Sequence, residues 1–204
     1  MKKNIKTGFL LFLFGLLTAL GTACAKDTIK ETANSAPLVK TEPAAKPPSD
    51  KGDSVVTGGA LAFMNAAAAG GMAEVELGKL AAEKADSADV KAFAQKMIED
   101  HSKAGDELKK LAEQKNVKLP PDVLPVHKQL MEKLSKLSGA NFDKEYVKAM
   151  VEDHKKDVTA FENASKTAGD ADVKAFAAKT LPTLKMHLEM IKGIADKMGV
   201  KMEA

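Results

Sequence analysis

Four polar residues of this chain have side chains of the kind that bind metals, and all four lie on predicted helices. Each falls on the apolar stripe of a different helix, and they are Glu74, His101, His154 and His187. With a rise of ~1.5 Å per residue, all four lie near the middle of a four-helix bundle. One carboxylate and three imidazoles at one level could hold zinc, iron or copper. The alternative is a buried Glu–His network that fixes the register of the helices without a metal.

The residues three places before the histidines distinguish a di-iron site from a mononuclear one. Ferritin-like di-iron proteins use Glu-x-x-His motifs, but the residues three places before these histidines are Ile98, Val151 and Leu184. A symmetric di-iron oxidase is therefore disfavoured, and a mononuclear site remains. Asp100 and Asp153 are expected on solvated faces, where they could hydrogen-bond the ligands if a metal binds. The fourth histidine, His127, is expected to be exposed.

The elements that must position these residues are helices. From position 61 onward the apolar residues recur at helical spacing, which predicts an all-α fold with long helices over residues 59–85, 88–115, 142–167 and 171–198. Ser87 and Asp170 suit N-caps, while Asn116 and Gly199 suit the left-handed residue that closes a helix. Gly70-Gly71 is expected to allow the close approach of a neighbouring helix.

The second half of the helical region repeats the first at a constant offset. The segment ADVKAFA occupies residues 88–94 and again residues 171–177, an offset of 83 residues (171 − 88). The same offset pairs Glu74 with Asp157 without a gap. The sequence therefore predicts a duplicated helical hairpin, and two hairpins bury their apolar stripes by packing as a four-helix bundle.

The connection between the two hairpins, residues 119–141, is too long for a tight turn. It has its own helical pattern, formed by Val126, Leu130, Leu134 and Leu137. A helix of ~14 residues rises ~21 Å, so it could carry the chain back along the bundle. Such a crossover helix predicts the ferritin-like arrangement. An up-down-up-down bundle with a decorated loop is the alternative.

Composition excludes several classes of function. All 31 basic residues are lysine, and the formal net charge is only +3. Guanidinium contacts to bases and phosphates are therefore absent, and no nucleic-acid partner is expected. The single cysteine excludes an internal disulfide and a cysteine-based zinc site. No nucleotide-binding motif occurs, so no nucleotide is expected, and enzymatic turnover is not expected either.

The N-terminal region predicts export. Within residues 1–24, three lysines precede an apolar run of about 16 residues, Gly8 to Ala23, which is typical of a signal peptide and shorter than the ~20 residues of a spanning helix. The run ends in LGTAC, which resembles a lipobox, so Cys24 is expected to be lipidated. Ordinary signal cleavage at Ala23-Cys24-Ala25 is the alternative.

A linker should join this signal to the bundle. Residues 25–58 contain four prolines among small and polar residues, and such a composition buries too little apolar surface to fold. We expect a disordered tether here, followed by the bundle at residues 59–202. The expected partner is a membrane, reached through the lipid anchor. The expected location is the periplasmic face of a cell-envelope membrane or, without the lipid, the soluble periplasm.

Five separated motifs resemble one bacterial family. They are EVELGKLA at 74–81, FAQKM at 93–97 with Asp100-His101, SGANFDKEY at 138–146, His154, and AAKTLPTL at 177–184 with His187. Together, over about residues 61–198, they resemble the family called domain of unknown function 4142. The resemblance implies a ferritin-like bundle in the outer membrane or periplasm, and it supplies no established reaction.

These observations predict an exported, lipid-anchored helical bundle that acts as a binding or stress-related module. Two alternatives stay open at this point. One is a mononuclear metal-binding protein, or a metal-dependent oxidase, that uses the buried Glu/His cluster. The other is a structural helical partner in the envelope.

Overall fold

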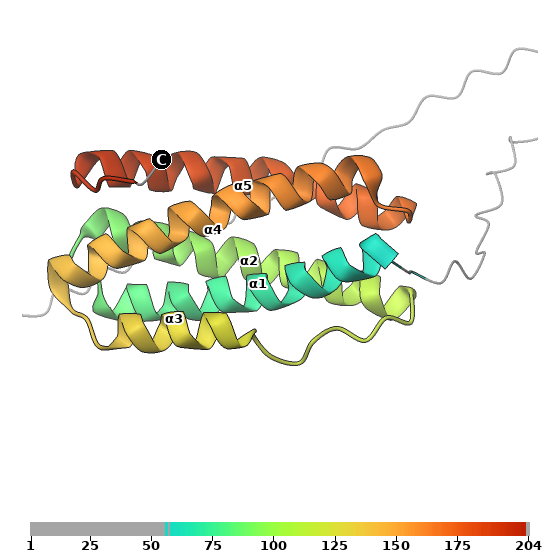
Figure 1. Cartoon of the computed structure of the whole chain (residues 1–204), viewed down its shortest axis with the longest axis horizontal. Helices are drawn as coiled ribbons and strands as arrows, with labels where there is room; N and C mark the ends of the chain where they lie inside the picture. Colours follow the sequence, from blue (N-terminus) through green and yellow to red (C-terminus); the bar gives the residue numbers. More distant parts are fainter. Residues whose placement is uncertain (1–55, 57, 203–204) are drawn as a thin grey trace, which may run out of the picture. The chain divides into compact units, whose positions relative to one another are not determined.

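The computed structural model describes Val56 and residues 58–202, all within one compact unit. These residues form five helices and no strand: α1 (Gly58–Lys84), α2 (Ala88–Gln114), α3 (Pro125–Ser135), α4 (Gly139–Thr167) and α5 (Ala171–Lys197) (Figure 1). The all-α prediction is confirmed, and the predicted bounds of the four long helices lie within three residues of those observed. None of the described helices is both long and apolar enough to cross a membrane. The predicted signal peptide and Cys24 lie outside the described residues.

Local hydrogen bonds and left-handed residues form the helix ends that the sequence predicted. The Val90 amide donates to Oγ of the N-cap Ser87 (3.4 Å), and the Asp172 and Val173 amides donate to Oδ1 of the N-cap Asp170 (2.9 and 3.1 Å). Asn116 has a φ of 52° and Gly199 a φ of 63°, so both residues close their helices in the left-handed region as predicted.

The start of α4 lies three residues earlier than the sequence pattern indicated. The helix begins at Gly139, whose φ is +59°. A Cβ at this position would lie 2.9 Å from Oδ2 of Asp86, so the turn needs glycine here for space as well as for conformation. The pattern missed this start because the first residues of α4, Gly-Ala-Asn, carry no large apolar side chain.

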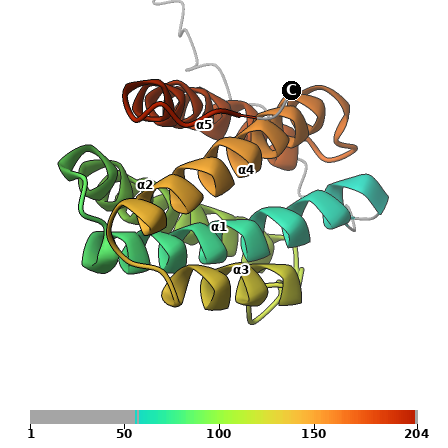
Figure 2. The same ribbon diagram turned by 60° about the vertical axis from the view of Figure 1, so that its left-hand side comes forward.

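The connection between the hairpins is a crossover. At the end of α2, Nζ of Lys115 lies 2.8 Å from Oδ2 of Asp170, beside the α4–α5 turn. At the start of α4, the Asp143 carboxylate accepts hydrogen bonds from the Asp86 and Ser87 amides of the α1–α2 turn (3.2 and 2.8 Å). α3 packs along α1 and carries the chain back between these two ends (Figures 1 and 2). α2 and α4 therefore run in the same direction, which is the ferritin-like order and excludes the up-down-up-down alternative.

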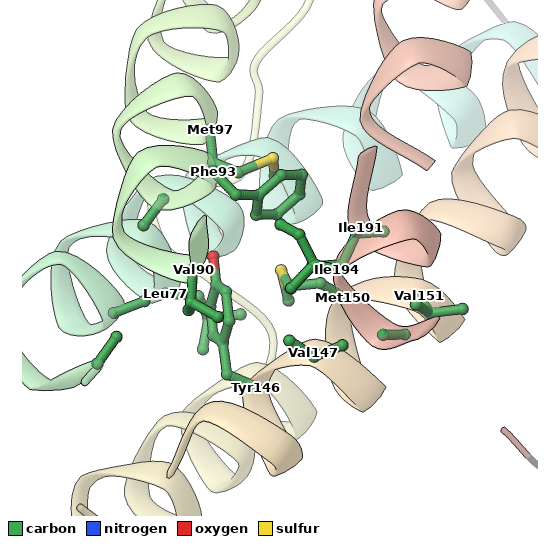
Figure 3. Packing of buried hydrophobic residues seen from close by; sticks show 14 of the residues in the cluster. Leu77, Val90, Phe93, Met97, Tyr146, Val147, Met150, Val151, Ile191 and Ile194 are labelled. Carbon is green, nitrogen blue, oxygen red and sulfur yellow. The ribbon is translucent and has the colours of Figure 1, made fainter. Parts of the chain in front are cut away.

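The interior holds two apolar clusters. The first lies toward the α1–α2 turn and includes Leu77, Phe93, Tyr146, Met150 and Ile191 (Figure 3). The second lies toward the α4–α5 turn and includes Met64, Leu108, Phe161, Phe176 and Leu184. Val56, from the range predicted as a tether, is also buried in the second cluster. Along every long helix the inward residues between the two clusters include a polar one, so a polar layer separates them.

The close approach of α1 to α2 occurs at Gly78. A methyl group on Gly78 would lie 3.0 Å from the Ala94 carbonyl oxygen and 3.0 Å from Cγ1 of Ile98. On Gly70 or Gly71 it would meet no atom within 4 Å. The expectation that Gly70-Gly71 mediates the approach was wrong, because these two residues border open space rather than a neighbouring helix.

Candidate metal centre

Three histidine rings meet in the polar layer between the apolar clusters. His101 comes from α2, His154 from α4 and His187 from α5, and none is more than 6% exposed. The ring centroids lie 5.3 to 5.8 Å apart. One nitrogen of each ring lies within 4.8 Å of the nitrogens offered by the other two. The structure thus brings together the three histidines that the helical spacing put at one height.

Each ring is held through one of its nitrogens. Nδ1 of His154 donates to the Met150 carbonyl (3.0 Å), Nε2 of His187 lies 2.8 Å from Oδ2 of Asp100, and Nδ1 of His101 lies 2.8 Å from Oε2 of Glu74. The opposite nitrogens, Nε2 of His101, Nε2 of His154 and Nδ1 of His187, have no hydrogen-bond partner among the described residues. One nitrogen fixed and the other presented is how proteins orient metal-binding histidines.

Glu74 occupies a position between the histidines and a group of acids. It is 2% exposed, and its Oε1 lies 3.5 Å from Nε2 of His154, within ion-pair distance. Its Oε2 is the partner of His101, so the side chain predicted as a metal ligand also positions another predicted ligand. Carboxylate oxygens of Glu74, Asp153 and Asp157 lie within 4.8 Å of one another.

Sequence reasoning missed Asp157 as a member of this site. A signal for it was present, because the offset of 83 residues pairs Asp157 with Glu74, and equivalent positions of the two hairpins face each other across the bundle. Asp153 was expected on a solvated face, but it is only half-exposed. Asp100 does hydrogen-bond a histidine, in the role considered for it.

Burial shifts the pKa values of the groups in the layer toward the neutral forms, except for Asp100. It raises the pKa of Glu74 well above its ordinary value, aided by the charge of Asp153, and raises the pKa of Asp157 to about 9. It lowers the pKa of His154 to about 3 and lowers the pKa values of His101 and His187 as well. At neutral pH the imidazoles therefore keep the lone pairs that a metal requires.

Asp100 differs from the other acids of the site. Partial burial alone would raise its pKa, but hydrogen bonds from Lys96 and His187 outweigh this effect and lower the pKa. The Asp100 carboxylate is therefore charged and accepts the Nε2 proton of His187. This arrangement fixes the tautomer that leaves Nδ1 of His187 free.

His127 does not join the three histidines. It lies on α3 and is half-buried, so the expectation of an exposed ring was wrong. Its Nδ1 is buried and has no hydrogen-bond partner among the described residues, so this side of the ring is covered by protein. The reason is that α3 packs against α1 and α4.

A hollow of about 120 Å³ between α2 and α5 leads from the surface to the rings. It is lined on the inside by His101 and His187 and farther out by Asp100, Glu107 and Lys179. Nζ of Lys179 lies 2.8 Å from Oε2 of Glu107 in its wall.

Comparison with known families identifies the chain. The model of the family described as "Domain of unknown function (DUF4142)" matches residues 45–194. The chain belongs to this family. A search of curated proteins finds no match for this DUF4142 protein.

Solved structures share its fold at low identity. A DUF305 fragment from Deinococcus radiodurans (TM-score 0.61, 13% identity) covers 70% of this chain and 98% of its own. A presumed secreted DUF305 protein from Streptomyces coelicolor has a TM-score of 0.61 and 13% identity, and the match covers 72% of this chain and 97% of the Streptomyces chain. CopM in its Cu(II)-bound form has a TM-score of 0.58 and 15% identity, and the match covers 68% of this chain and 96% of the CopM chain. These likenesses show a common helical-bundle fold.

Proposed function

We propose that this DUF4142 protein binds one transition-metal ion through Nε2 of His101, Nε2 of His154 and Nδ1 of His187. The observation that carries the proposal is the convergence of three buried, neutral imidazoles whose presented nitrogens lack hydrogen-bond partners among the described residues. Imidazole suits zinc, copper and iron, and the Irving–Williams order gives Cu²⁺ the highest affinity for such ligands. Copper is therefore the first ion proposed, and zinc the second.

The dimensions of the site fit such an ion after a small movement. Bonds of ~2.0 to 2.1 Å to nitrogen at tetrahedral angles place two ligand nitrogens about 3.4 Å apart. One nitrogen of each ring lies within 4.8 Å of one nitrogen of each of the other two rings. A movement of each ring by about 1 Å would close the site around an ion. Three protein nitrogens leave at least one coordination position for Glu74 or for a ligand from solution.

The structural neighbours add support at the level of the fold. CopM has been solved in Cu(II)-bound and Cu(I)-bound forms. At 15% identity this shows that a bundle of the same kind accommodates copper. The choice of ligands in the present chain depends on its own histidines.

We further propose that the protein acts in the cell envelope as a metal-binding or stress-related module. Three observations support this proposal. Residues 1–24 resemble a signal peptide, a lipobox-like segment precedes Cys24, and the fold is like that of a presumed secreted protein. The function proposed is binding rather than turnover.

Elemental analysis of the exported, untagged protein, followed by titration of the stripped form with Cu²⁺ and Zn²⁺, tests metal binding. The wild type should bind about one equivalent, and His154→Phe should lose this binding. His127→Ala is the matched control, because it removes the one histidine outside the cluster, and it should bind as the wild type does. Less than a tenth of an equivalent in the wild type would reject the proposal and favour a structural Glu–His network.

A further inference from the structure

Three glycines interrupt the inward faces of α1 and α2 beside the histidines. Gly70 and Gly71 share a helix face with Glu74, and Gly105 shares one with His101, because residues three and four positions apart lie on the same face. A glycine in a helix interior is less favourable than alanine by up to about 1 kcal/mol. A methyl group on any of the three would meet no atom within 4 Å, so close packing does not explain them.

The same glycines line a cavity of about 30 Å³ inside the bundle. Its apolar walls include Phe161 and Phe176, and its polar lining includes Glu74, His101 and Asp157. Oε1 of Glu74 and Nε2 of His101 lack hydrogen-bond partners among the described residues, and these side chains are only 2% and 6% exposed. Because a water needs roughly 10–15 Å³ of such space, the cavity has room for a ligand of only a few atoms.

We infer that this cavity is the pocket for an exogenous ligand of the metal ion, of one to three heavy atoms. With a metal bound, the ligand in the resting protein would be water or hydroxide, and small anions would replace it. The inference rests on the proposed metal binding. His101 borders both the cavity and the three-nitrogen cluster, so a coordination position left by the histidines can face the cavity. Oε1 of Glu74 is placed to accept a hydrogen bond from a bound water, and the aromatic walls exclude larger ligands.

Sodium azide added to the Cu(II)-loaded full-length protein tests this inference, with bound copper measured in parallel. The wild type should develop a saturable azide-to-copper charge-transfer band, and the bulkier imidazole should not compete for the position. Gly70→Ala combined with Gly105→Ala should bind copper with unchanged stoichiometry but bind azide at least roughly tenfold more weakly, because the added methyl groups crowd the pocket. Gly193→Ala is the matched control, since it adds a methyl group at an exposed position on α5 with no atom within 4 Å, and it should behave as the wild type.

Each result has a separate meaning. Copper-loaded wild type without an azide band, or a double variant that binds azide as tightly as the wild type, would overturn the pocket while leaving the metal site in place. A wild type that retains no copper would overturn the proposed function and this inference with it.

Discussion

At the scale of single residues, the polar layer carries an energetic cost. Four buried atoms have no hydrogen-bond partner among the described residues: Oε1 of Glu74, Nε2 of His101, Nε2 of His154 and Nδ1 of His187. A buried polar group left unsatisfied costs about 1–3 kcal/mol. A metal ion with its water ligand would satisfy these atoms together. The proposed binding would therefore remove a cost that the metal-free layer carries.

Replacing Glu74 by glutamine tests whether Glu74 positions His101 for metal binding or only stabilises the folded protein. Burial raises the pKa of the Glu74 carboxyl well above its ordinary value, and glutamine has nearly the same shape, so we expect Glu74→Gln to change the unfolding free energy by less than about 1 kcal/mol. Loss of the carboxylate beside His101 should weaken metal binding by roughly 10- to 100-fold. Calorimetric titration of metal and urea unfolding measure the two effects.

Glu76→Gln provides the control on the same helix. Glu76 is exposed and pairs only with the exposed Lys79 in the ion pairs described, so this variant should bind metal with wild-type affinity. Equal affinities for all three proteins would show that Glu74 does not position a ligand.

The raised pKa of Asp157 predicts a pH dependence of stability. Its pKa of about 9 in the folded protein exceeds its ordinary 3.8, so its stabilising contribution is complete below pH 3.8 and is lost as the pH rises toward 9. The lowered histidine pKa values act in the opposite sense, but only below their ordinary 6.5. From about pH 7 to 9, urea unfolding of the metal-free protein should therefore show a loss of about 1–3 kcal/mol.

Asp157→Asn should flatten this decline, because the amide does not titrate. A wild-type protein whose unfolding free energy stays constant or rises from about pH 7 to 9 would show that the acid group is charged in the folded state.

At the scale of helices, the duplicated hairpins play unequal parts. With the offset of 83 residues, the position equivalent to His154 in the first hairpin is Gly71, and the position equivalent to His187 is Ala104. One hairpin thus supplies two imidazoles at the height where the other supplies small residues. This asymmetry leaves room for the rings and for the cavity beside them, which a symmetric di-iron site would have filled with ligands from both hairpins.

Periodicity and caps were sufficient to predict the helices, because burial, capping and chain reversal are local properties of the sequence. They also put Glu74 and the three histidines at one height. Which nitrogen of each ring is held, and how Asp157 approaches Glu74, depend on rotamers and helix rotation that spacing does not determine. The role of Gly70-Gly71 was mispredicted for the same reason, since a small residue borders either a neighbouring helix or a void.

Gly78→Ala tests the close approach of α1 and α2. The new methyl group would crowd a backbone oxygen and Ile98 at 3.0 Å, so we expect a loss of about 1–3 kcal/mol in unfolding free energy. Gly193→Ala, where nothing lies within 4 Å, should instead stabilise the protein by up to about 1 kcal/mol. Chemical denaturation compares the two variants, and a stabilising Gly78→Ala would mean that the helices lie farther apart.

At the scale of the whole molecule, the crossover α3 sets which helices are neighbours. It makes α1 antiparallel to α4 and α2 antiparallel to α5, and these pairs are in contact. Apolar clusters at both ends hold the polar layer between them, so the site is clamped on two sides by packed side chains. A rigid surround of this kind limits the movement of ligands and favours a defined coordination geometry.

The proposed anchoring in the envelope depends on Cys24. In the native host, a labelled fatty-acid analogue should be incorporated into the wild type, while Cys24→Ser should carry no label. A wild-type protein that is cleaved after the apolar run and stays unlabelled would support ordinary signal cleavage and reject the lipid anchor.

Anomalous diffraction at the copper absorption edge, from crystals of the Cu(II)-loaded protein, tests whether His101, His154 and His187 hold a metal ion. We expect one strong peak inside the bundle, about 2.0–2.1 Å from Nε2 of His101, Nε2 of His154 and Nδ1 of His187. No peak among the three rings, with copper found only on the surface, would contradict it.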